Sequence, residues 1–350
     1  MTTIAAPAPL VTGGVDTHLD VHVAAALDSL GGVLGTASFP TTASGYRQLH
    51  RWLRTFGDVG KVGVEGTGSY GVELSRHLSS QGVQVIEVSR PNRQVRRRYG
   101  KTDVVDAIAA ARAVQSGEAS AIPKSHDGDV EALRALKVLQ RSARKARTQA
   151  LNQLRNLLVT APDELRTKLR DLSTKELLET CVSFRVAADD DTLAGITRYA
   201  LRDLAHRVID LDQRQDAIRT RLHRIAVAVA PELLAIKGIG PDVAATLLLT
   251  AGDNPGRLRS ERSFAALCGT NPVPASSGKT QRHRLNRGGD RQANAALWRV
   301  ALVRLGSDQR SKDYMNKRIS EGKSKKEAIR CLKRYIAREV FAALPREHLI

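Results

Sequence analysis

Four acidic residues within the first 106 positions have the types and the spacing for metal-dependent chemistry. Asp16 lies in an apolar run that reads as a strand, and Glu65 ends a second such run. Asp103 and Asp106 are three residues apart where a helix is expected to begin, so both fall on one helix face. Converging carboxylates repel one another unless a cation lies between them, and oxygen ligands suit Mg²⁺ or Mn²⁺. The pattern predicts such a metal site, of the kind that cleaves or transfers phosphodiesters.

A simpler interpretation of these acids is that strand ends and helix starts often carry Asp or Glu for capping and solubility. Capping is sufficient for any one of the four residues. The order and context of all four favour a shared site.

The elements that would position these acids follow an α/β order between residues 11 and 120. Residues 11–27 and 32–39 read as the two arms of a hairpin around 28–32. After them, strands and helices alternate, a pattern that predicts a mixed sheet. The expected helices are 44–56 and 72–81, and the expected strands are 61–65 and 83–88. This is the order of a ribonuclease-H-like fold.

Two long helices are expected next, at 130–159 and 193–229, from their apolar spacing. They are polar on one face, which favours an antiparallel coiled-coil arm or an oligomerisation arm over an ordinary helical bundle. A third region begins near Pro231, where Ile236–Pro241 resembles a helix-hairpin-helix turn before an apolar helix at 243–250. Such a turn can hold a phosphate on backbone N–H groups, although a purely structural turn fits equally well. The chain is therefore divided into 1–125, 126–230 and 231–350.

Composition narrows the choice of partner. The chain has a formal net charge of +19 and a pI of about 10.3, which indicates a polyanion. Nucleic acid is favoured over membrane, because no apolar run approaches the length of a spanning helix. The three cysteines, Cys181, Cys268 and Cys331, have no metal-ligand spacing, which argues against both zinc and disulfides. Residues 1–11 lack the pattern of a secretory signal, so a prokaryotic cytoplasmic protein is expected.

Two basic segments accompany the candidate chemistry. The first directly precedes Asp103, and its cations are Arg90, Arg93, Arg96, Arg97, Arg98 and Lys101. A basic run beside a metal site is what a phosphodiester substrate needs, because the cations neutralise the backbone.

The second basic segment follows a pair of serines, Ser276 and Ser277, which precede Gly278. Its cations are Lys279, Arg282, Arg284, Arg287 and Arg291. A serine hydroxyl attacks a phosphodiester only when cations or a metal stabilise the developing charge. Residue types alone favour a polar loop that grips the phosphate backbone without chemistry.

These motifs resemble those of the DEDD transposases of bacterial insertion sequences, the IS one-ten / one-one-one-one family, also described as bridge-RNA-guided recombinases. The resemblance covers nearly the whole chain. Its N-terminal motifs are Gly14–His18, Val64–Tyr70 and Lys101–Ala107. Its C-terminal motifs are Ile236–Pro241, Cys268–Pro272, Ser276–Gly278 and Arg287–Arg291.

The resemblance implies a RuvC-like catalytic domain over 1–125, a coiled-coil arm over 126–230 and a C-terminal transposase domain over 231–350. It implies Mg²⁺ binding by the four acids, and a covalent phosphoserine formed by Ser277, the serine that directly precedes glycine. Ser276 stays an alternative nucleophile. The implied partners are DNA, a noncoding guide RNA and further copies of the chain in a dimer or tetramer. Such an enzyme would associate with the nucleoid when it acts.

Two other functions fit parts of the pattern. A Holliday-junction-type nuclease would use the same carboxylates with water and no serine. A non-catalytic nucleic-acid-binding protein would have lost the acids, which are intact here. The serine and its basic loop favour the transposase.

Overall fold

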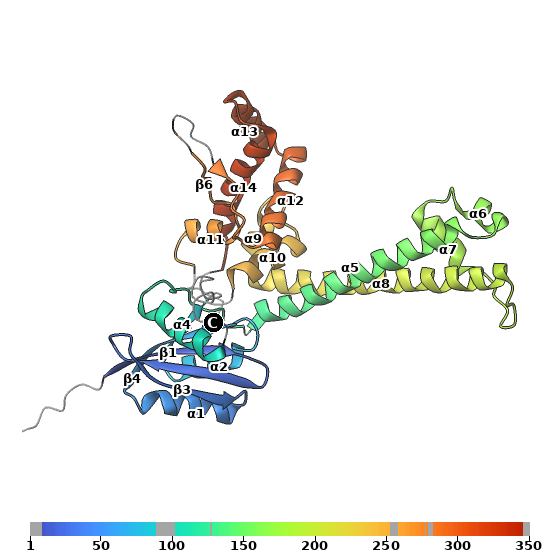
Figure 1. Ribbon diagram of the computed structural model, residues 1–350. Coiled ribbons are helices and arrows are strands. Elements are labelled where there is room, and N and C mark those ends of the chain that lie inside the picture. Colours follow the sequence, from blue (N-terminus) through green and yellow to red (C-terminus); the bar gives the residue numbers. More distant parts are fainter. Residues whose placement is uncertain are drawn as a thin grey trace, which may run out of the picture. The chain divides into compact units, whose positions relative to one another are not determined.

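The computed structural model describes residues 9–88, 102–126, 128–252, 258–276, 278 and 283–345 (Figure 1). The chain divides into two compact units. The first comprises residues 1–127, 252–259 and 349–350, and the second comprises 128–251 and 260–348. The second unit thus contains both the long helices and the C-terminal region, which the sequence analysis separated at residue 231. That boundary stays a prediction.

The first unit is built on a mixed sheet. In the described residues the sheet has five strands in the order β3-β2-β1-β4-β5. β1 pairs in parallel with β4 and β4 with β5, whereas β1–β2 and β2–β3 are antiparallel. The strands are β1 Leu10–Thr17, β2 Val21–Leu27, β3 Val33–Pro40, β4 Asp58–Glu65 and β5 Gln84–Val88. The expected mixed α/β sheet is confirmed, and it is compatible with a ribonuclease-H-like fold.

One predicted strand was wrong. The expected single arm at 11–27 is two strands, and the chain turns between Thr17 and Val21, where Thr17 pairs with His22. Both strands are apolar and mostly buried, so hydropathy gave little sign of the three exposed residues between them. The turn at 28–32 joins β2 to β3 as expected. There, Asp28 accepts hydrogen bonds from the backbone N–H groups of Leu30 and Gly32, both at 2.8 Å.

Helices cover both faces of the sheet. On one face, α1 (Ala43–Arg54) and α2 (Val72–Ser80) pack their leucines against the strands. On the other face, α4 (Asp103–Gln115) lies across β1, β2 and β4 through its alanines. Because α4 carries two of the candidate acids at its start, its docking decides where those acids lie.

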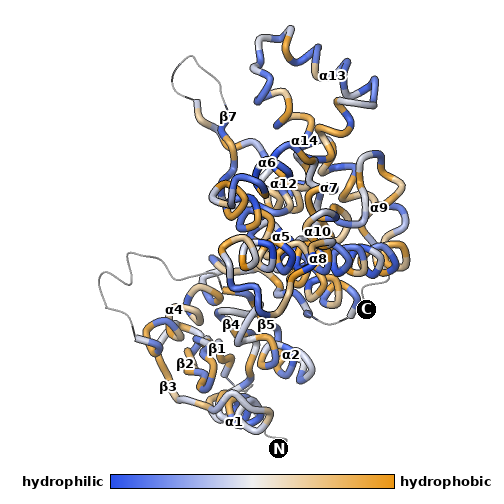
Figure 2. The backbone as a smooth tube through the Cα atoms, turned by 90° about the vertical axis from the view of Figure 1, so that its right-hand side faces the viewer, coloured by the Kyte–Doolittle hydropathy of each residue, from blue (hydrophilic) through white to orange (hydrophobic). Residues whose placement is uncertain are grey.

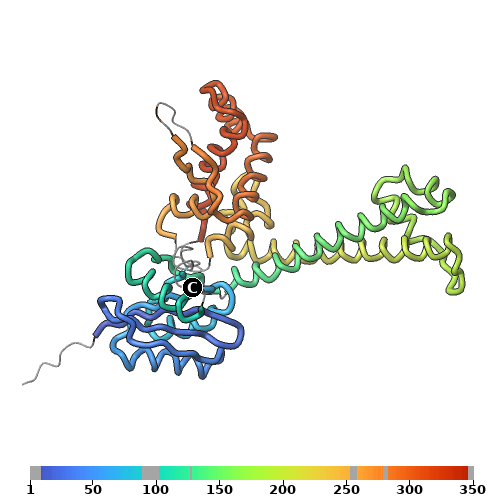
Figure 3. Tube along the Cα trace, in the orientation of Figure 1, coloured from blue at the N-terminus to red at the C-terminus, as the bar shows by residue number. Residues whose placement is uncertain are grey.

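The second unit contains a long helical arm. α5 (Gly128–Val159) and α8 (Leu193–Val229) lie side by side, coloured green and yellow in Figures 1 and 3. Two short helices that the sequence analysis missed, α6 (Asp163–Leu169) and α7 (Thr174–Val182), pack against them around a leucine-rich core. This end of the arm is a small helical bundle. A coiled coil and a role in assembly stay predictions.

The rest of the second unit is mainly helical, as expected, with one short hairpin. Its elements are α9 Pro231–Ala235, α10 Pro241–Ala251, α11 Glu261–Leu267, β6 Val273–Pro274, β7 His283–Arg284, α12 Arg291–Ser307, α13 Gln309–Ser320 and α14 Lys325–Ala342. Long hydrophilic stretches of α13 stand out in blue in Figure 2. In the part of the chain that the structure describes, no helix is long and apolar enough to cross a membrane.

The turn that resembles a helix-hairpin-helix lies between α9 and α10. Gly238 has φ +89°, a conformation that favours glycine. The backbone carbonyl of Lys237 accepts a hydrogen bond from Arg304 Nε at 2.9 Å, and Lys237 Nζ donates to the carbonyl of Ser307 at 2.7 Å. These contacts fasten the turn to α12, which gives it a structural role.

Candidate metal centre and basic platform

Two glycines let α4 approach the sheet closely. A Cβ atom at Gly14 would collide with the backbone of Ala107 and Ala111, and a Cβ at Gly63 would lie 2.7 Å from the carbonyl oxygen of Ala110. The helix therefore rests on β1 and β4 through backbone and small side chains. This contact fixes the start of α4 beside the ends of both strands.

Strand alternation places Asp16 and Glu65 on the face that α4 covers. Side chains two residues apart on a strand share a face, so Asp16 follows Gly14 and Glu65 follows Gly63. The parallel pairing of Val15 with Val64 brings the next positions of both strands to the same edge. The Thr17 hydroxyl also donates to the carbonyl oxygen of Glu65 at 2.7 Å.

The other two acids lie in the first turns of α4. Thr102 caps the helix, because its hydroxyl accepts a hydrogen bond from the backbone N–H of Val105 at 3.3 Å. The Asp103 side chain is 51% exposed, whereas Asp106 is buried. Carboxylates are favourable at a helix N-terminus, so the sequence can hold two of them here without destabilising α4.

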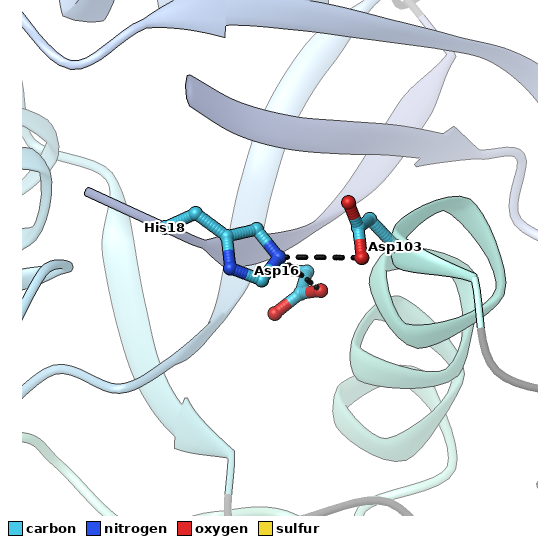
Figure 4. Close-up of side chains that lie close together, drawn as sticks. All are labelled: Asp16, His18 and Asp103. Carbon is cyan, nitrogen blue, oxygen red and sulfur yellow. Dashed lines mark ion pairs between the residues drawn. The ribbon is translucent and has the colours of Figure 1, made fainter. Parts of the chain in front are cut away.

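A histidine joins the acidic cluster. His18 Nε2 lies 3.2 Å from Asp16 Oδ2 and 3.3 Å from Asp103 Oδ1, as Figure 4 shows. In the part of the chain that the structure describes, this trio has ligand atoms within 4.8 Å of one another. His18 lies within the Gly14–His18 motif, whose sequence alone assigned it no role. Its position two residues after a strand-borne aspartate was the available signal, since such spacing can return a side chain to the same edge.

The charge on Asp16 is disfavoured by its surroundings. Burial raises the pKa of Asp16, the neighbouring His18 lowers it, and the charges of Asp106 and Asp103 raise it further. Asp16 is therefore electrostatically coupled to both acids of α4. A bound cation would reverse this penalty, because it favours the charged form of each carboxylate. The donor set, with several carboxylates and one imidazole, fits a divalent metal such as Mg²⁺ or Mn²⁺.

The structure thus brings Asp16 and Asp103 into one cluster and couples Asp106 to it through charge. Glu65 ends the neighbouring strand at the same edge but is not a member of the tight group with His18.

Several other predicted site residues lie outside the described residues. They are Arg90, Arg93, Arg96, Arg97, Arg98, Lys101, Ser277, Lys279 and Arg282. The neighbouring Ser276 is described and is exposed. Arg284, Arg287 and Arg291 are exposed on β7 and around the start of α12, where they can reach a polyanion.

The glycine-rich motif between β7 and α12 serves a structural purpose that sequence reasoning missed. Asp290 caps α12 by accepting hydrogen bonds from the N–H groups of Gln292 at 2.7 Å and Ala293 at 3.2 Å. It also accepts from the Thr250 hydroxyl at 3.1 Å. A Cβ at Gly289 would collide with Gly269, so two motifs meet through bare backbone. We call this hydrogen-bonded region, 265–272 with 286–294, the basic platform.

Asn side chains hold the basic platform together. Asn294 Nδ2 donates to the carbonyls of Cys268 and Gly269, both at 2.9 Å. Asn286 Nδ2 donates to Asn271 Oδ1 at 2.7 Å. The strands β6 and β7 flank Ser276 and Ser277 in the sequence. β6 directly follows one segment of this platform, and β7 comes shortly before the other.

Comparison with known proteins adds family information to this geometry. Residues 13–161 match a DEDD-type IS110 model described as a transposase, and residues 230–316 match the model "Transposase IS116/IS110/IS902 family". The first match covers β1 and α4, which carry the acidic cluster, and the second covers the basic platform.

Curated relatives agree with these matches. An IS110 insertion-element protein of Streptomyces coelicolor, named as uncharacterized, is 26% identical over 45% of this chain and 40% of its own length. A putative transposase of Sinorhizobium fredii is 28% identical over 64% of this chain and 56% of its own. An uncharacterized IS900 insertion-element protein of Mycobacterium paratuberculosis is 30% identical over 42% of this chain and 37% of its own.

The chain thus matches about half or less of the length of these relatives, so the alignments establish similarity only over the shared segments. The first transposase model includes the region of the acidic cluster, and the two models together match parts of both units. Both matched segments are thus similar to transposases of the IS110/IS116 family.

Proposed function

We propose that this protein is a DNA transposase that cleaves and rejoins phosphodiesters at a divalent metal site formed by Asp16, Glu65, Asp103 and Asp106. The observation that carries the proposal is the cluster of Asp16 on β1 with Asp103 at the start of α4, beside the end of β4 that carries Glu65, in a strongly basic chain. The two partial matches to transposase models support the same chemistry.

The chain's own residues have distinct roles in this proposal. Asp16 and Asp103 would hold the metal, with Glu65 and Asp106 completing the set, and Mg²⁺ or Mn²⁺ bound there would stabilise charge at the reacting phosphate. His18, between Asp16 and Asp103, fixes the orientation of both carboxylates. The burial that raises the pKa of Asp16 also keeps bulk water away from this ligand.

The proposed nucleophile is Ser277, with Ser276 as the alternative. Its hydroxyl oxygen forms the new bond to phosphorus while the bond from phosphorus to a sugar oxygen of the DNA breaks. Support comes from its place between β6 and β7 and from the cations around it in the sequence, such as Lys279 and Arg284. Cations at this position can stabilise the charge of a pentacoordinate phosphate.

The proposed partners are the DNA of the element and its target, a noncoding guide RNA, and further copies of the chain. The net charge of +19 supports the nucleic acids. The arm formed by α5 and α8 is a candidate surface for assembly. The basic run from Arg90 to Lys101 is expected to carry backbone contacts, so charge reversal at Arg96–Arg98 should lower both affinity and salt dependence.

The experiment that tests the proposal traps the covalent intermediate. Full-length protein is incubated with labelled DNA carrying element ends, denatured and resolved on a gel. We expect a protein–DNA adduct that Ser277→Ala eliminates, that Ser276→Ala only reduces, and that metal removal abolishes. Mass spectrometry after proteolysis should locate the phosphate on Ser277. Metal-dependent cleavage without any adduct would instead identify a water-using nuclease, and modification at Ser276 would move the nucleophile.

The four carboxylates need a separate test. Asp16→Ala, Glu65→Ala, Asp103→Ala and Asp106→Ala should each abolish strand exchange and leave nucleic-acid binding largely intact, because the basic surface supplies most of the affinity. Asp58→Ala is the matched control, since Asp58 is an exposed acid at the other end of β4. Exchange at the wild-type rate in Asp103→Ala would refute the four-acid site.

A further inference from the structure

A cavity of about 410 Å³ opens in the second unit, beside the basic platform. It lies between β7 and the facing surfaces of α13 and α14. Its walls include Arg284 of β7, Tyr314 and Arg318 of α13, and Lys333 and Tyr335 of α14. The volume falls in the range of roughly 300–1,000 Å³ found for small-ligand sites. Nothing in the acidic cluster or in the proposed serine chemistry requires this cavity.

Positive charge dominates the cavity wall. Its cationic lining residues are Arg284, Arg318, Lys323, Arg330, Lys333, Arg334 and Arg338, and its acidic ones are Glu321 and Glu327. Ion pairs neutralise part of the excess: Arg318 pairs with Glu321 at 2.7 Å and Arg330 with Glu327 at 3.6 Å, and Glu261 pairs with both Arg334 at 2.7 Å and Arg338 at 3.0 Å. The remaining excess predicts an anionic ligand, because buried charges in proteins are normally compensated.

Lys333 is the most informative of these cations. It is only 4% exposed, and its Nζ donates a hydrogen bond to Asn294 Oδ1 at 2.6 Å. Among the residues that the structure describes, no carboxylate forms an ion pair with it. Burial lowers its pKa, as does the charge of Arg330. An anion in the cavity would compensate this amine, and Asn294 links it to the basic platform.

Aromatic rings complete the cavity. Tyr314 and Tyr335 pack edge to face with ring centroids 5.2 Å apart, and Tyr335 is 44% exposed. Arg318 Cζ lies 5.2 Å from the centroid of Tyr314, and Arg338 Cζ lies 5.5 Å from that of Tyr335. An exposed ring among arginines is the arrangement on which an unpaired base stacks while its phosphate meets the cations.

We propose that this cavity binds a nucleotide of a single-stranded nucleic-acid segment, with its phosphate compensating Lys333 and its base stacked on Tyr335. The inference rests on the proposed function only in taking nucleic acid as the ligand. A polymer is favoured over a free nucleotide because exposed cations continue from Arg284 to Arg287 and Arg291 along the basic platform. A cavity of this size holds one splayed nucleotide and excludes a base pair in a duplex.

The test measures equilibrium binding by fluorescence anisotropy, with full-length protein and chelator present, so that strand cleavage plays no part. The probes are a labelled DNA strand of about 10 nucleotides, an all-abasic strand of the same length, the RNA counterpart and a blunt duplex. Tyr335→Ala should weaken binding of the base-bearing strands about tenfold, whereas Tyr335→Phe retains binding. Neither change should affect the abasic strand or the duplex.

Lys333→Met tests the phosphate contact. It should weaken binding of the base-bearing and abasic strands alike, by clearly more than Lys326→Gln, which removes an exposed charge from α14 outside the cavity. Thermal unfolding checks that the Lys333→Met variant is folded, and the exposed Tyr335 provides a variant that does not disturb the core. The DNA and RNA arms identify which strand the cavity prefers.

Equal losses for base-bearing and abasic strands in Tyr335→Ala, or no loss, would overturn the stacking assignment. A Lys333→Met effect no larger than that of Lys326→Gln would show that the cavity is only part of a general basic surface. If the wild-type protein performed no strand exchange but gave these binding results, the proposed function would be refuted and the nucleotide cavity would still be supported.

Discussion

The acidic cluster of the first unit and the basic cavity of the second unit carry opposite charges in similar surroundings. Each gathers like charges in a partly buried place, and in each the environment disfavours the charge. Burial raises the pKa of Asp16 and lowers the pKa of Lys333, so both groups are pushed toward their neutral forms. A bound ligand of opposite charge would lower the electrostatic cost of keeping either group charged. The comparison supports the two proposals, a metal cation for the first site and a phosphate for the second.

The two sites differ in how the fold positions them. The acids depend on backbone packing, since α4 rests on Gly14 and Gly63 and carries Asp103 to the sheet edge. The cavity depends on side-chain contacts between elements far apart in sequence, such as Lys333 with Asn294. A change in backbone packing should therefore damage the first site most, and loss of hydrogen bonds should damage the second.

The largest expected effect is that of Gly14→Val. The new side chain would collide with the backbone of Ala107 and Ala111, so we expect a loss of about 3 kcal/mol in the free energy of unfolding. Metal binding should be lost as well, because α4 is displaced. Gly306→Ala in α12 is the control: apart from its chain neighbours and the adjacent helix backbone, no described residue has an atom within 4 Å of the added Cβ, and alanine is the better helix former. Denaturant titration of both variants measures the difference, and an unchanged Gly14→Val midpoint would break the packing argument.

A buried histidine gives the first unit a distinctive pH dependence. Burial lowers the pKa of His22 to about 4 from 6.5, and its ring stacks on Tyr46. The unfolded chain therefore binds the proton first, so stability is complete above pH 6.5 and falls as the pH drops toward 4. The loss is about 3 kcal/mol by linkage. His22→Phe keeps the stacking and should remove this part of the decline. Unfolding curves that depend on pH identically in both proteins would contradict the assignment.

Asp290→Ala should damage the basic platform of the second unit. It removes the cap of α12 and the partner of the Thr250 hydroxyl, which together should cost about 2 kcal/mol. Asp290→Asn should restore much of the loss, because an amide oxygen also accepts at an N-cap. Thermal unfolding provides the comparison. An Asp290→Ala variant that unfolds at the wild-type temperature would mean that the stability of the platform does not depend on this cap.

The smallest effect should come from a single exposed cation. Arg287→Gln should lower the slope of log affinity against log salt by about one, if Arg287 contacts one phosphate. Arg219→Gln on the arm is the control, since Arg219 is exposed and pairs with Asp216 at 3.1 Å. Binding titrations at several salt concentrations give both slopes. Equal slopes for Arg287→Gln and the wild type would remove Arg287 from the interface.

The sequence predicted the features that depend on local pattern. The alternation of strands and helices, the start of α4 at Asp103 and the limits of α8 follow from apolar period and capping, and the structure confirms them. The break between β1 and β2 was missed because both strands are apolar, and α6 and α7 because short helices carry a weak periodic signal.

The sequence could not predict features that depend on distant contacts. His18 meets Asp103 only because Gly14 lets α4 settle on β1. Lys333 meets Asn294 only once α12 and α14 are packed. The basic cavity was invisible for the same reason: its cations are spread over β7, α13 and α14 and look like ordinary surface charges in sequence.

Direct Mn²⁺ binding is the most direct test of the claim that the four carboxylates form one metal site. Titration of full-length protein should give saturable binding that Asp16→Asn, Glu65→Gln, Asp103→Asn and Asp106→Asn each weaken at least about tenfold, or 1.4 kcal/mol. Asp58→Asn, at the other end of β4, should bind as the wild type does. Wild-type affinity in Glu65→Gln or Asp106→Asn would contradict the four-acid site and leave only the cluster of Asp16, His18 and Asp103.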